Sequence, residues 1–130
     1  MIVLDTDVLI FFLKGKKEIS KNIIQIFQSS QRLGLSIISL AEIYEGIFSD
    51  EKQSQQKQKK LESFLKFVEI LDFDKNAAQI FGKIRGVLRK KNKIIDNCDL
   101  MIASTCICNN FLFYTGNQKH FNQIPGLVLY

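Results

Sequence analysis

The chain has 130 residues, 46% of them hydrophobic, which favours one folded domain (residues 1–130) over a disordered chain. Eighteen lysines and arginines against 13 acids give a net charge of +5, a weak sign of a polyanionic partner such as nucleic acid, an acidic protein or an anionic membrane surface. The acid at Asp5 comes too early for a signal peptide, and no apolar run approaches the ~20 residues of a membrane span. We therefore expect a cytoplasmic protein with no membrane segment. Three cysteines, an odd number, cluster in one predicted helix without CxxC spacing or a zinc-type histidine pair, so we interpret Cys98, Cys106 and Cys108 as reduced thiols.

The first half of the chain alternates short apolar runs with helical spacing. The predicted strands are residues 2–4 and 35–38, and the predicted helices are residues 8–13, 18–30 and 39–48. Asp7 or Thr6 is the expected cap of the first helix, and Ser39 is expected to open the third. Residues 49–60 are rich in Gln, Lys and Ser without Gly or Pro, which favours a solvated helix continuing towards Phe67 over a loop.

The second half continues the alternation. The predicted strands are residues 68–71, 111–115 and 127–129. Asp74 caps a strong amphipathic helix, Asp96 caps a second helix that ends at Asn109, and residues 116–121 form a turn or short helix. Strands separated by helices predict an α/β fold with a central, mainly parallel sheet of about four to five strands, flanked by helices on both faces.

Three acids far apart in the sequence lie near predicted strand ends. Asp5 ends the first strand, Glu42 follows the second, and Asp99 heads the helix before the fourth, which Thr115 and Asn117 follow. Because parallel sheets collect binding residues beyond the carboxyl ends of their strands, these side chains can converge. Clustered carboxylates are held together by a hard cation such as Mg²⁺ or Mn²⁺, which can activate water and screen a phosphate under attack.

Each acid also has a structural interpretation. Asp5 could cap the next helix, and Asp96 is chiefly a cap. Glu42 fits a capping box opened by Ser39 and points nearly opposite the apolar stripe of its helix, which favours a structural role from spacing alone. Asp99 is the strongest functional candidate, because it lies on the apolar side of its helix with no obvious partner.

The remaining polar features are less specific. His120 is expected to be a surface turn residue before Phe121. A basic run precedes the Asp96 stretch, where it either stabilises a helix end or receives an RNA backbone. The candidate RNA-binding residues are Arg85, Arg89, Lys90, Lys91 and Lys93.

Four blocks in order, residues 3–10, 39–46, 95–103 and 115–121, resemble the PIN-domain ribonucleases, in particular the small VapC-type toxins of toxin–antitoxin pairs. Residues 124–127 also look like the end of that family, so the likeness covers essentially the whole chain. Any one block is weakly specific, whereas four blocks with matching order and spacing are strongly so.

The resemblance implies a PIN fold in which Asp5, Glu42 and Asp99 hold the metal, and it reverses the structural interpretation of Glu42. It implies a Mg²⁺- or Mn²⁺-dependent endoribonuclease that cuts RNA, often tRNA or mRNA, through a metal-activated water that attacks the phosphodiester. A cognate antitoxin would inhibit it, and homodimers are usual in the family. Thr6, Thr115 and Asn117 would support the ligands.

The chain departs from the family at one place. Many relatives carry a fourth acid in the block that follows the fourth strand, whereas the candidate positions here are Asn117 and His120. Asn117 and Asp96 are the further candidates for metal contacts, and the site is expected to hold a second metal more weakly. The alternative function is a non-catalytic PIN-fold module that binds RNA or protein. A third hypothesis, a phosphatase similar to the haloacid dehalogenases, rests only on Asp5-Thr6-Asp7 and lacks the later residues of that motif.

Overall fold

A computed structural model describes all 130 residues. At its centre is a five-stranded sheet in which every neighbouring pair is parallel, in the order β3-β2-β1-β4-β5. The strands are β1 (Ile2–Leu4), β2 (Leu33–Ser36), β3 (Val68–Leu71), β4 (Leu112–Tyr114) and β5 (Val128–Leu129). The predicted α/β class and parallel sheet are therefore confirmed.

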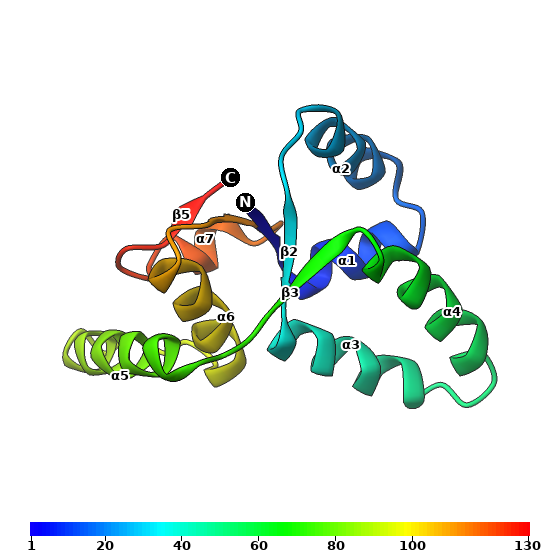
Figure 1. Cartoon of the computed structure of the whole chain (residues 1–130). Coiled ribbons are helices and arrows are strands. Elements are labelled where there is room, and N and C mark those ends of the chain that lie inside the picture. Colours follow the sequence, from blue (N-terminus) through cyan, green and yellow to red (C-terminus); the bar gives the residue numbers. More distant parts are fainter.

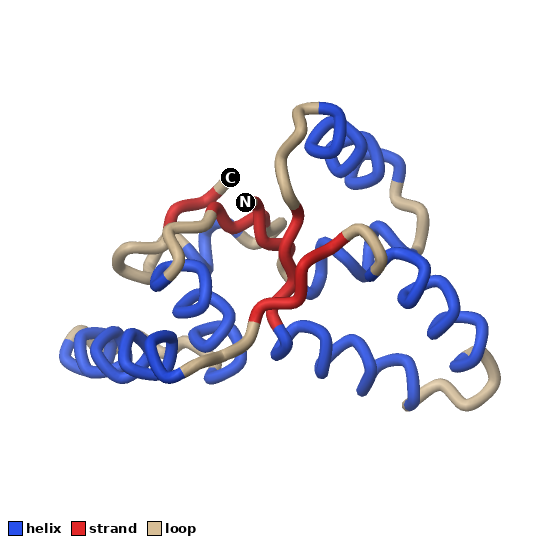
Figure 2. The backbone as a smooth tube through the Cα atoms, in the orientation of Figure 1, coloured by secondary structure: helices blue, strands red, loops and turns tan.

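Seven helices connect and cover these strands. They are α1 (Thr6–Leu13), α2 (Lys17–Gln28), α3 (Ile37–Phe48), α4 (Ser54–Leu65), α5 (Lys75–Lys90), α6 (Asn97–Cys108) and α7 (Gln118–Phe121). Figure 1 shows α1 to α4 on one side of the sheet and α5 to α7 on the other. In Figure 2 the strands form the middle layer between these two groups of helices.

Both faces of the sheet are buried, which explains why β1 is apolar at every position. Ile2 and Leu4 belong to the core on the α1–α4 side, and Val3 belongs to the core on the α5–α6 side. All three side chains are almost completely inaccessible to solvent. A parallel strand covered on both faces has no solvated side, so its sequence shows no alternation of polar and apolar residues.

The start of α3 differs from the prediction. β2 ends at Ser36, and the Ser36 hydroxyl accepts a hydrogen bond from the amide of Ile38 at 3.2 Å, so Ser36 caps the helix. Ser39 lies inside the helix, is buried, and its hydroxyl has no hydrogen-bond partner. The predicted capping box of Ser39 and Glu42 is therefore wrong, because the strand lies two residues earlier than expected, at Leu33–Ser36, and the helix follows it directly.

The starts of the other helices agree with the prediction at α5 and α6 and differ from it at α1 and α4. Asp74 and Asp96 cap α5 and α6 as predicted, accepting from the amides of Ala77 and Cys98 at 2.8 Å each. Asp5, rather than Asp7 or Thr6, is at the N-cap position of α1, but its side chain makes no capping bond. The Gln- and Lys-rich segment is a turn followed by α4, a shorter helix than expected.

Two further observations concern the chain as a whole. No helix is long and apolar enough to cross a bilayer. The three cysteines are free thiols, as predicted, and burial raises the pKa of the Cys106 thiol far above its usual value.

Candidate active site

The three predicted acids lie at the carboxyl-end edge of the sheet. Asp5 directly follows β1, Glu42 is in the second turn of α3, and Asp99 is in the first turn of α6. Burial is the main cause of the raised pKa values of Asp5 and Glu42, and the negative charge of Asp99 adds to both. Asp99 therefore lies within electrostatic range of the other two acids.

Asp5 is the most buried of the three, with 6% of its surface exposed. Burial raises the pKa of its carboxyl from 3.8 to about 6, and the nearby charges of Asp7 and Asp99 act in the same direction. The hydroxyl of Thr115, which follows β4, opposes this rise by donating a 2.6 Å hydrogen bond to Oδ2. The side chain of Asp5, after β1, is therefore bonded to a residue that follows the neighbouring strand β4, and it does not cap α1.

Glu42 is held by the residue that follows Asp5. The Thr6 hydroxyl donates to Oε2 of Glu42 at 2.5 Å, which ties the start of α1 to α3. Partial burial raises the pKa of Glu42, and the charges of Asp99, Asp96 and Asp7 raise it further. Glu42 thus lies among the other acids.

Asp99 has a partner that the sequence analysis did not foresee. Nε2 of His120 lies 2.8 Å from Oδ2 of Asp99, and both side chains are half-buried, at 28% and 30% exposure. The expectation that His120 is only a surface turn residue is wrong. It belongs to the short helix α7, and its contact with Asp99 joins this helix to the first turn of α6.

Two residues at this edge were missed as site residues. His120 follows β4 closely, so the strand-end rule that selected Thr115 and Asn117 could have selected it as well. Asp7, treated only as a helix cap, is exposed in the first turn of α1, and its charge raises the pKa of Asp5 and Glu42. No periodicity in the sequence indicated that Asp7 faces these acids.

The predicted supporting residues take distinct positions. Thr115 accepts a 2.9 Å bond from the backbone amide of Asn117 while it donates to Asp5. The side chain of Asn117 is exposed and makes no hydrogen bond, and Asp96 is exposed with one oxygen engaged as the cap of α6. Neither residue replaces a missing acid by direct contact with the other three carboxylates.

Among the predicted RNA-binding residues, Arg85 has an internal partner. Its guanidinium donates to the carbonyl of Ile95 at 2.7 Å and to Oδ1 of Asn97 at 2.8 Å, and it lies over the ring of Phe81. These bonds fasten α5 to the start of α6, two residues before Asp99. The other members of the basic run are exposed, namely Arg89, Lys90, Lys91 and Lys93.

The chemistry of the donors fits a divalent cation. No three or more His, Cys, Asp or Glu side chains are grouped closely enough to hold a metal ion in this conformation. Each of the three carboxylates nevertheless has one oxygen bonded to a side chain and a second oxygen without a side-chain donor. Carboxylate oxygens are the ligands that Mg²⁺ and Mn²⁺ prefer, and a cation would offset both the burial and the neighbouring negative charges that raise the pKa values of Asp5 and Glu42.

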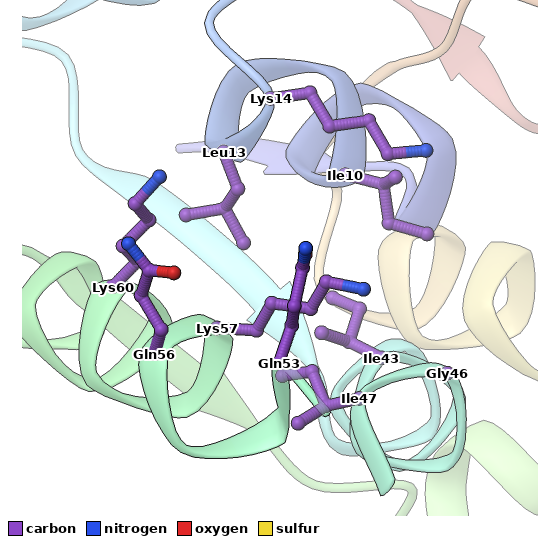
Figure 3. A pocket seen from close by; sticks show the side chains of 10 residues that line it. All are labelled: Ile10, Leu13, Lys14, Ile43, Gly46, Ile47, Gln53, Gln56, Lys57 and Lys60. Atoms are coloured by element: carbon purple, nitrogen blue, oxygen red, sulfur yellow. The ribbon is translucent and has the colours of Figure 1, made fainter. Parts of the chain in front are cut away.

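A separate pocket lies between α1, α3 and α4 (Figure 3). Its apolar side chains come from α1 and α3, and lysines and glutamines stand around them. The lining residues are Ile10, Leu13, Lys14, Ile43, Gly46, Ile47, Gln53, Gln56, Lys57 and Lys60. None of the acids of the site contributes to it, so this pocket is distinct from the carboxylate edge.

Comparison with known proteins agrees with this fold. A family model described as the PIN domain matches residues 2–127. This chain belongs to the PIN-domain family. Within that family it is homologous to the VapC ribonucleases of toxin–antitoxin systems, and the resemblance inferred from the four sequence blocks is confirmed.

Two curated relatives illustrate the likeness in sequence. Ribonuclease VapC2 of Rickettsia felis is 35% identical over 127 residues, which cover 98% of this chain and 94% of the relative. The tRNA(fMet)-specific endonuclease VapC of Salmonella typhimurium is 31% identical over 127 residues, covering 96% and 92% of the two chains.

Solved structures give the same assignment. The Rickettsia felis VapBC2 structure, bound to a DNA fragment from its promoter, superposes with a TM-score of 0.92 at 34% identity and covers 100% of this chain and 98% of that chain. The DNA-bound VapBC structure from Salmonella typhimurium gives 0.89 at 28% identity, covering 99% and 96%. The five-stranded parallel sheet and its helices are therefore those of the VapC toxins.

Proposed function

We propose that this protein is a Mg²⁺- or Mn²⁺-dependent endoribonuclease toxin, in which Asp5, Glu42 and Asp99 hold the metal. The observation that carries the proposal is the position of three carboxylates at one edge of the sheet, where each has one oxygen bonded to a side chain and a second oxygen without a side-chain donor: Asp5 after β1, Glu42 on α3 and Asp99 on α6. The relatives named as ribonucleases over the full length of the chain support the reaction class.

The residues of the chain divide the work as follows. Asp5, Glu42 and Asp99 would hold the cation, which when bound would activate water and screen the phosphodiester under attack. Thr115 and Thr6 each donate to one carboxylate oxygen and thereby fix the orientation of Asp5 and Glu42. Asn117 and Asp96 stand at the margin of the site, where they would contact the hydration shell of the cation.

RNA would reach this edge along the carboxyl end of α5. Arg89, Lys90, Lys91 and Lys93 are exposed and directly precede the segment that carries Asp96 and Asp99. Cations in this position neutralise RNA phosphates and release their counterions, so the affinity for RNA should fall as salt rises. Arg85 would serve this surface indirectly, by holding the start of α6.

The decisive experiment is cleavage of total RNA with and without a chelator. We expect products that need Mg²⁺ or Mn²⁺ and disappear in Glu42→Gln, Asp99→Asn and Asp5→Asn, with a folded far-ultraviolet spectrum in each variant. Glu51→Gln, an exposed acid in the turn before α4, is the matched control and should cut normally. Chelator-insensitive background without metal-dependent products would favour the alternative, a PIN-fold module that binds RNA or protein without turnover.

We further propose that a cognate antitoxin inhibits the protein by binding the pocket of Figure 3. Its apolar lining and the lysines beside it suit an amphipathic segment that carries acids. Lys57 already pairs with Asp50 at 2.6 Å, which leaves Lys14 and Lys60 as the cations available to a partner. Relatives solved as VapBC complexes support an antitoxin as the partner.

Charge reversal in the pocket tests this assignment. The double variant Lys14→Glu and Lys60→Glu should lose most of its affinity for the product of the adjacent small reading frame and still cut RNA. Lys59→Glu, on α4 but outside the pocket, is the control. Equal inhibition of wild type, the double variant and Lys59→Glu would place the antitoxin elsewhere.

Light scattering of the purified toxin tests the homodimer that the resemblance implies.

A further inference from the structure

His120 touches one of the proposed metal ligands, yet the proposed function gives it no task. Nε2 of His120 is 2.8 Å from Oδ2 of Asp99, and no other side chain bonds to that carboxylate. Asp5 and Glu42 are each held by a threonine hydroxyl. Each of the three acids therefore has one side-chain hydrogen-bond partner: Thr115 for Asp5, Thr6 for Glu42 and His120 for Asp99.

The direction of this hydrogen bond follows from the chemistry of its partners. An ionised carboxylate only accepts, so Nε2 of His120 carries the hydrogen and donates it to Oδ2. Oδ1 of Asp99 has no side-chain donor. The contact therefore occupies one oxygen of Asp99 and leaves the other available to a cation.

The imidazole is held in place by the core. Phe121 is 3% exposed and packs against Phe113 of β4, with ring centroids 4.8 Å apart. The His120 ring lies edge-on to Phe121 at 5.0 Å and 89°. The backbone amides of His120 and Phe121 both donate to the carbonyl of Asn117, at 3.0 and 3.2 Å, which closes the single turn of α7. These contacts hold the backbone that carries the imidazole next to Asp99.

We propose that His120 is a positioning residue for RNA cleavage, whose Nε2–H holds Oδ2 of Asp99 so that Oδ1 is presented to the cation. The proposal rests on the proposed metal-dependent nuclease function. The segment from Thr115 to His120 then fixes two of the three acids, because Thr115 holds Asp5 at one end and His120 holds Asp99 at the other. A histidine donor takes one of the positions where the family resemblance leads us to expect a fourth acid, and it orients a carboxylate instead of adding one.

A positioning role differs from a purely structural contact in what it changes. A structural contact between half-exposed side chains affects the stability of the fold and little else. A partner that orients a ligand affects the affinity for the metal, typically about 10- to 100-fold when it is removed. Metal affinity therefore separates the two roles.

The test compares wild type with His120→Leu, His120→Gln and Gln118→Leu, all without purification tags. Leu removes the donor, Gln keeps an N–H at a similar reach, and Gln118→Leu makes the same polar-to-apolar change at an exposed position of α7. We expect Mn²⁺ titration calorimetry to show affinity at least about 10-fold weaker in His120→Leu. The other two variants should keep the wild-type affinity. In His120→Leu, the kcat of RNA cleavage should be lower and the KM for RNA unchanged.

The metal-free protein gives a second readout. His120 is the single histidine of the chain, so a proton–nitrogen correlation spectrum of the imidazole is unambiguous. We expect the proton on Nε2, with slow exchange that becomes fast in Asp99→Ala. An Nε2 atom that carries no proton would overturn the proposal, and so would a spectrum that Asp99→Ala leaves unchanged. Both results would count even if His120→Leu failed to fold.

The outcomes separate the two proposals. Equal Mn²⁺ affinity in wild type and His120→Leu, or an equal loss in His120→Gln, would overturn positioning while the nuclease function stood. A wild type that binds Mn²⁺ but cuts no RNA would overturn the nuclease function, and the affinity series would still decide positioning. A wild type that binds no Mn²⁺ would overturn both.

Discussion

The substitution Asp5→Asn should make the metal-free protein more stable while it abolishes RNA cleavage. Burial raises the pKa of Asp5 from 3.8 to about 6, so the folded state keeps a proton that the unfolded chain has already lost. Stability of the wild type therefore falls as the pH rises from about 4 to about 6, and it stays low above that window. Because each tenfold change in proton affinity is worth about 1.4 kcal/mol, the ionised carboxylate costs up to about 3 kcal/mol at neutral pH.

Asparagine keeps the shape and an oxygen that can accept from Thr115, but it carries no charge. The stability difference between Asp5→Asn and wild type should be near zero at about pH 4 and reach about 3 kcal/mol at about pH 7, a melting-temperature rise on the order of 10 °C. Urea denaturation at several pH values in chelator measures it, with Glu51→Gln as control. Added Mn²⁺ should stabilise the wild type and not the variant. If the variant is no more stable than wild type at neutral pH, the reasoning that the buried, ionised carboxylate of Asp5 destabilises the fold is refuted.

Four further substitutions test the side chains and helix ends around the site. Thr115→Val removes the donor to Asp5, so the pKa of Asp5 should rise further, and urea denaturation at neutral pH should show a loss of about 1–3 kcal/mol; an unchanged pH profile would contradict this. Arg85→Ala removes two hydrogen bonds and the contact with Phe81, so the free energy of unfolding should fall by about 2 kcal/mol and amide exchange at the start of α6 should become faster. Arg89→Ala, by contrast, should weaken RNA binding without a loss of stability. Asp74→Ala removes the cap of α5 and should cost about 1 kcal/mol while RNA cleavage persists; loss of cleavage at full stability would show that α5 affects the site by another route.

Local sequence patterns determined the elements of this protein. The apolar run of β1 identified a strand buried on both faces, and Asp74 and Asp96 identified the starts of α5 and α6. These features depend on side-chain period and on capping bonds within a few residues, which a linear pattern records. The same reasoning misplaced the start of α3 at Ser39, because Ser36 and Ser39 offer the same capping chemistry and only the end of β2 decides between them.

The tertiary structure decided which side chains meet. Thr115 bonds to Asp5 across 110 positions of the sequence, Thr6 bonds to Glu42 across 36, and His120 bonds to Asp99 across 21. Sequence reasoning could place the acids near one edge of a sheet, but not pair them with their donors. Those pairs exist because β1 lies between β2 and β4 in the sheet, which brings the segments that follow these strands together, and the order of strands is a long-range property that no local periodicity encodes.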